Sequence, residues 1–144
     1  MSTRCTTHFV YGHSNPPVAI IYRHTDGYPE GAGVDLRKFL AECAKLKDSR
    51  LNDPSYLAAK YVVFLADMFN WKYNFSNSEI TKSRPKSRLE FVSVGVVAED
   101  PCDIEFRYTV NCENFEDGLP HISCVSAYSH KQVDIPQIPQ ETNA

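Results

Sequence analysis

The sequence predicts a single α+β domain with the element order ββααβββ, in which an antiparallel sheet carries two helices packed on one face. Apolar and polar residues alternate without interruption over residues 104–112, which is the pattern of a strand with one buried side. Apolar residues recur at spacings of three and four over residues 35–46 and again over 54–69, which is the pattern of helices that pack on a core. Strands at both ends of the chain with helices between them are typical of the α+β class.

The first two strands are expected over residues 5–11 and 18–24, where β-branched and aromatic residues are concentrated. Turn-forming residues separate the two runs. Pro16 and Pro17 have no amide hydrogen for a strand ladder, so they fit a loop between antiparallel partners.

Two helices follow these strands. The first is expected over residues 35–46, where leucine, phenylalanine and cysteine form one apolar face. The second is expected over residues 54–69, because the carboxylate of Asp53 can cap its first turn and Pro54 suits the first helical position.

Three further strands are expected over residues 89–98, 104–112 and 121–128. The polar segment 76–88 before them holds the basic cluster of the chain, made of Lys82, Arg84, Lys86 and Arg88. We interpret this segment as a solvated surface loop, and a flap over an anionic ligand is the alternative.

Length and composition fit one compact domain. The chain has 144 residues, of which 42% are hydrophobic, so it can bury a core without disulfides or metals. Residues 1–128 are expected to form this domain and residues 129–144 an extended or frayed tail, because the tail is poor in apolar residues. The net charge of −3 argues against strong binding to duplex nucleic acid.

The sequence predicts a cytoplasmic protein with no membrane partner. The five cysteines are scattered and include no C-x-x-C pair, which favours reduced structural thiols. No apolar run reaches the roughly 18 residues that a membrane span needs. The first residues lack the apolar core of a secretory signal.

Polar side chains crowd into the connection between the second strand and the first helix. The guanidinium of Arg23 suits a phosphate, His24 can donate or accept a proton near neutral pH, and Tyr28 offers a ring for stacking on a base. The carboxylates of Asp26 and Glu30 can accept hydrogen bonds from sugar hydroxyls or base amino groups. Glycines beside a helix start let backbone amides approach an anion. Together these groups predict a nucleotide-sized binding site.

We predict that a residue on the outward side of a later strand also contributes to this site. The predicted ligand-binding residues are Arg23, His24, Asp26, Tyr28, Glu30 and Arg107. No catalytic residue, metal ligand or cofactor is predicted. A structural interpretation competes with this one, because Asp-Gly and Tyr-Pro are turn dipeptides and Asp35 can cap the helix in place of an anion.

Residues 21–31 resemble a signature of small proteins found in bacteriophages and their bacterial hosts, with the core Tyr-x-His-x-Asp-Gly-Tyr-Pro-Glu-Gly. Residues 53–59 and 103–108 are also similar to blocks of these proteins. The resemblance implies no activity. It implies a context, that of a phage-type accessory protein which acts in the host cytoplasm and counters host defence.

Three functions fit the predicted site. The first is a counter-defence protein, dimeric or of higher order, that binds and sequesters a small anionic, nucleotide-like ligand; this is our principal hypothesis. It needs no nucleophile paired with a base, and the predicted site has none. The second is an inhibitor that binds a host defence protein, as anti-CRISPR proteins do, with Glu99, Asp100 and Asp103 imitating nucleic acid.

The third function is a phosphoester hydrolase or metal-dependent nuclease. In this hypothesis His24 and Asp26, joined by His8 or His121, supply an acid and a base or hold a metal ion.

Overall fold

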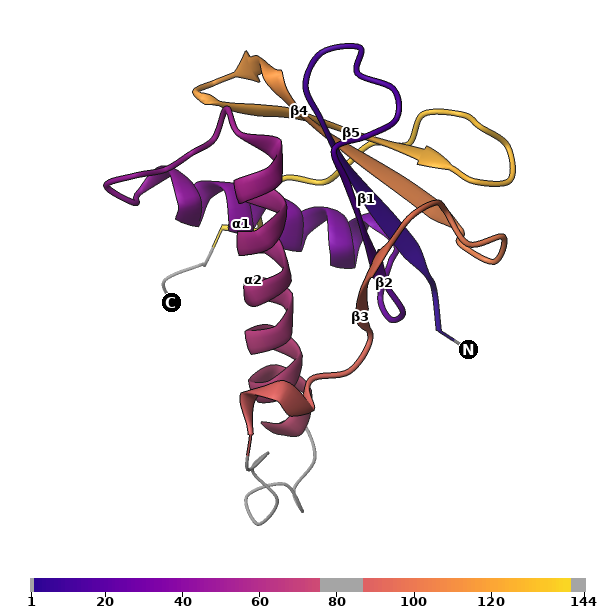
Figure 1. Cartoon of the computed structure of the whole chain (residues 1–144). Coiled ribbons are helices and arrows are strands. Elements are labelled where there is room, and N and C mark those ends of the chain that lie inside the picture. Colours follow the sequence, from indigo (N-terminus) through magenta and orange to yellow (C-terminus); the bar gives the residue numbers. More distant parts are fainter. Residues whose placement is uncertain (1, 76–86, 141–144) are drawn as a thin grey trace.

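A computed structural model describes residues 2–75 and 87–140 of the chain, and Figure 1 shows how its elements are arranged. Most of the expected basic loop, including Lys82, Arg84 and Lys86, lies outside the described residues. The interpretation of that loop therefore stays a prediction.

Five strands form one sheet. They are β1 (Cys5–Val10), β2 (Ala19–Arg23), β3 (Val94–Val97), β4 (Phe106–Glu116) and β5 (Leu119–Ser126). Their order across the sheet is β3-β2-β1-β4-β5. The two N-terminal strands are thus central, and later strands are added on either side of them.

The prediction of a purely antiparallel sheet is wrong, because the sheet is mixed. The pairs β1–β2, β2–β3 and β4–β5 are antiparallel, but β1 and β4 run parallel, with Cys5 opposite Phe106 and Phe9 opposite Val110. Parallel strands need a crossover connection. Here residues 98–105 lead from β3 at one edge to β4 beyond β1.

Two long helices pack on one face of the sheet, as the sequence predicts (Figure 1). They are α1 (Val34–Ala44) and α2 (Pro54–Phe75), and the second extends past its expected end because no glycine or proline interrupts it. A π-helical turn over Pro29–Gly33 precedes α1. A short 3-10 helix, Arg88–Glu90, replaces the first part of the third expected strand, and the Ser87 side chain caps it by accepting from the Leu89 amide.

Aromatic side chains from both helices and the sheet meet in the core. Phe39 of α1 and Tyr61 of α2 have ring centroids 4.9 Å apart, and Phe9 of β1 lies 5.6 Å from Tyr61. Four of the five cysteines are buried in their reduced form, and burial raises the pKa of the Cys5 thiol to about 12. Thiols with such a raised pKa are inert packing groups, as expected for structural cysteines.

The segment after β5 is extended and lies against the domain. Gln132 forms a β-bridge with Val125, and the guanidinium of Arg37 on α1 donates to the carbonyls of Ile135 (2.9 Å) and Pro136 (2.8 Å). Within the described part of the chain, no helix has the length and apolar character required to cross a membrane.

Candidate functional site

The predicted site residue Arg23 is part of the core. Its side chain is 2% exposed, and its Nη1 donates to Oδ2 of Asp35 at 2.9 Å. Its Nε donates to the carbonyl of Thr25 at 2.7 Å, and its guanidinium carbon lies 5.1 Å from the ring centre of Phe69. These contacts join β2 to α1 and α2, so the Arg23 guanidinium has a structural role in the core.

The glycines of the predicted site also serve the fold. A Cβ at Gly31 would lie 2.6 Å from the carbonyl oxygen of Asp26, so only glycine fits this turn. The amide of Gly31 donates to the carbonyl of Tyr28, and that of Ala32 donates to the carbonyls of Asp26 and Tyr28. The amides of Gly31 and Ala32 are therefore bonded to main chain instead of an anion.

The remaining residues of the turn lie at the surface. The hydroxyl of Tyr28 donates to Oδ1 of Asp26 at 3.3 Å, and both Tyr28 and Glu30 are exposed. Asp26 adopts a left-handed backbone conformation with φ of 54°. Ligand binding by these three residues stays a prediction.

His24 faces the side of the sheet that carries no helix. Its Nδ1 accepts from the Tyr22 hydroxyl at 2.7 Å and from Nε of Arg4 at 3.3 Å. Because two donors approach Nδ1, the neutral ring carries its proton on Nε2. Arg4 also lies 3.4 Å from Oδ2 of Asp103, so an arginine, a histidine, a tyrosine and an aspartate form one group there.

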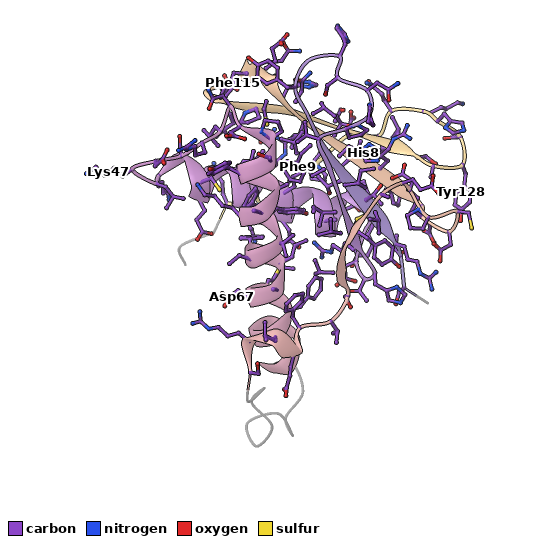
Figure 2. All side chains as sticks on the ribbon, in the orientation of Figure 1. His8, Phe9, Lys47, Asp67, Phe115 and Tyr128 are labelled. Atoms are coloured by element: carbon purple, nitrogen blue, oxygen red, sulfur yellow. The ribbon has the colours of Figure 1, made fainter. Side chains whose placement is uncertain are left out.

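A second polar group lies further along the same helix-free face. The crossover 98–105 places Asp100 there, and its Oδ1 accepts from Thr6 at 2.6 Å and contacts Nε2 of His8 at 2.7 Å. Nη1 of Arg107 lies 3.4 Å from Oδ2 of Asp100. Figure 2 shows the adjacent residues His8 and Phe9 on opposite sides of β1, with Phe9 toward α2.

Asp100 is ionised in this group. Partial burial by itself would raise the pKa of its carboxyl, but the hydrogen bonds from His8 and Thr6, together with the charge of Arg107, hold that pKa below its usual value. The resulting carboxylate fixes the orientation of the His8 ring.

Arg107 and Asp100 also line a cavity of about 230 Å³ between the crossover and the end of β5. Cys102, Tyr128 and His130 are among the other lining residues. Of the six predicted site residues, Arg107 is the one that lines this cavity. It is separated from Arg23, because the two side chains project from opposite faces of the sheet.

A larger cavity of about 740 Å³ lies between α1 and α2. Its wall is apolar at Phe39, Phe64 and Met68, and its lining also includes lysines and carboxylates. None of the six predicted residues lines it. Among the described residues, no group of three histidines, cysteines or carboxylates is arranged to hold a metal ion.

The prediction did not join Thr6, His8, Asp100 and Arg107 into one group. A partial signal was present, because strand alternation over residues 5–11 places Thr6 and His8 on one face. No local pattern indicates that Asp100, 92 residues after His8, would cross that face.

A scan against protein-family models gave no match to this chain, and searches of curated proteins and of solved structures gave none either. The fold and the candidate site define an α+β domain with polar side-chain groups on the helix-free face of its sheet.

Replacing Arg23 should destabilise the protein. Because Arg23→Ala leaves the Asp35 carboxylate buried without its partner, we expect the free energy of unfolding to fall by about 3–5 kcal/mol. Arg107→Ala should change it by less than about 1 kcal/mol, since that ion pair is partly exposed. Urea unfolding followed by circular dichroism measures both; equal losses would contradict the assignment of Arg23 to the core.

The contribution of the Asp100 carboxylate to stability should depend on pH and be lost in strong acid. Since its pKa in the folded protein lies below the ordinary value of 3.8, the stability it contributes is present above that value and is lost as the pH falls further. We expect Asp100→Asn to cost more free energy of unfolding at pH 6 than at pH 3. A cost that is the same at both pH values would show that the carboxylate charge is not what stabilises the group.

Proposed function

We propose that this protein binds and sequesters a small anionic, nucleotide-like ligand at the cavity beside Arg107. The observation that supports the proposal is the exposure of the Arg107 guanidinium together with its long contact with Asp100. Its side chain is 41% exposed, it opens onto the cavity, and its contact with Asp100 is a long one of 3.4 Å. Arg107 therefore has donors to offer a ligand, whereas Arg23 is used by the core.

The cavity wall fits a phosphate attached to an aromatic base. A guanidinium has five N–H donors in a planar fork, and Asp100 engages one nitrogen of Arg107. His130 adds an imidazole, and the exposed ring of Tyr128 can stack on a base. The volume of about 230 Å³ matches part of a mononucleotide, so the rest of the ligand would extend over the helix-free face.

Binding without turnover is the activity that this chemistry favours. Cys102 is the thiol on the cavity wall, and no hydrogen bond joins it to a base within residues 2–75 and 87–140. Covalent catalysis needs a nucleophile activated in that way. The resemblance of residues 21–31 to phage proteins adds the proposal that the sequestered molecule is a host defence signal.

A second candidate is phosphoester hydrolysis, which the His8–Asp100 contact favours. A histidine held by a carboxylate at 2.7 Å is the arrangement of a general base with its orienting group. In this candidate His8, which contacts the cavity-lining residue Asp100, takes a proton from a water molecule.

The test is thermal unfolding of the purified protein with mono-, di- and cyclic nucleotides. A bound ligand should stabilise the protein by about 2.7 kcal/mol at a hundredfold excess over its Kd, and so raise the melting temperature. Arg107→Ala should weaken binding at least tenfold, because it removes the donors to the phosphate.

Arg50→Ala is the matched control. Arg50 is 42% exposed and contacts Asp48, but it lies away from the cavity, so this variant should bind normally. Ligand recovered intact supports sequestration, and ligand recovered as product supports the hydrolase. If no nucleotide shifts the melting temperature, ligand binding is wrong, and the inhibitor of a host protein becomes the better hypothesis.

A further inference from the structure

The strand β3 is an open edge of the sheet. The amide of His24 donates to the carbonyl of Ser93 at 2.8 Å. This bond shows which residue pairs of the β2–β3 ladder are hydrogen-bonded and which are not. In an antiparallel ladder, successive residues turn their backbone groups alternately toward and away from the partner. Gly95 therefore faces β2, and Val94 and Val96 turn their N–H and C=O groups outward.

Residues Val94–Val97 of this edge lack the usual protection against pairing, although Ser93, just before them, has a left-handed φ of 73°. Edge strands generally carry a charge, a proline or a bulge that blocks another strand. Residues 92–98 read Val-Ser-Val-Gly-Val-Val-Ala, with neither charge nor proline. The side chains of Val92 and Val96 are 68% and 71% exposed. The strand thus offers both free backbone groups and apolar side chains.

The second half of the opposite edge, along β5, is covered by the chain itself. The amide of Val133 donates to the carbonyl of Cys124 at 2.9 Å, and the amide of Ser126 donates to the carbonyl of Lys131 at 3.0 Å. Pro120, nearer the start of β5, has no amide hydrogen to offer. Of the outward-facing residues of β5, Ile122 alone keeps both backbone groups for another strand, so pairing with β5 of another copy is disfavoured and β3 is left to pair with β3.

We propose that two copies of this chain join through antiparallel pairing of their β3 strands, with a two-fold axis at Gly95. In this register Val94 of one copy lies opposite Val96 of the other, so that every outward N–H and C=O of both residues is bonded. The five-stranded sheets become one continuous sheet.

The side chains support this register. No atom lies within 4 Å of a Cβ built at Gly95, and two glycines at the axis let the strands approach without collision. The exposed Val96 side chain packs against Val94 of the other copy, as cross-strand neighbours do. Because the contact uses the same patch on both copies, it is closed by the two-fold axis and assembly ends at a dimer. The proposal does not depend on ligand binding at Arg107.

The test is the mass in solution, measured by light scattering and by sedimentation velocity. The protein should have twice the 16.3 kDa of the chain. Val96→Pro should give a monomer, because it removes an outward amide that β2 does not use. Val96→Lys should also give a monomer, because it places charges of the same sign near the axis. Circular dichroism checks that the variants fold, and Val96→Lys decides the question if Val96→Pro unfolds.

Val63→Lys is the matched control. Val63 is 68% exposed and lines the cavity between α1 and α2, away from β3. This variant should therefore remain a dimer. A wild-type protein that stays at 16.3 kDa at all concentrations overturns the proposal. So does a Val96→Lys variant that still dimerises, and so does dissociation caused by Val63→Lys, since either result places the interface elsewhere.

Discussion

The buried ion pair between Arg23 and Asp35 is the contact on which the arrangement of this domain depends. It ties the end of β2 to the first turn of α1, and the guanidinium also lies against Phe69 of α2. A buried charge without its partner is strongly destabilising, so the turn between β2 and α1 must place Asp35 beside Arg23. A Cβ at Gly31 would lie 2.6 Å from the Asp26 carbonyl oxygen, which shows how tightly this turn is wound.

Both helices pack on one face of the sheet, and polar side chains are grouped on the other face. The parallel pairing of β1 with β4 makes this possible, because the chain must then cross from one edge of the sheet to a place beyond β1. The crossover lays Asp100 on Thr6 and His8, and Asp103 beside Arg4. Two acidic residues from one short connection thus organise the arginines and histidines of the helix-free face.

The two arginines of the predicted site differ in their burial. Both have an aspartate partner, at 2.9 Å for Arg23 and 3.4 Å for Arg107. The first is enclosed by two helices and satisfied by carbonyl, carboxylate and ring. The second is 41% exposed beside a cavity, which is where we propose that an anionic ligand competes with Asp100. A sheet joined through β3 would leave both cavities of a dimer open, because β4 lies on the far side of β1 from that edge.

The sequence by itself determined most of the local structure, with the 3-10 helix Arg88–Glu90 as an exception. Alternation predicted which residues of β4 are buried, and the spacing of apolar residues predicted both helices and their packing on one face. It did not determine the direction of β4, because alternation is the same for parallel and antiparallel strands. It also did not determine that Arg23 is buried while Arg107 is exposed, since both are arginines at polar-looking strand positions. Only the tertiary structure decided these points. Strand pairing and the crossover bring together residues that are about ninety positions apart. A local sequence pattern cannot predict such contacts, because it relates only residues that are near one another in the chain.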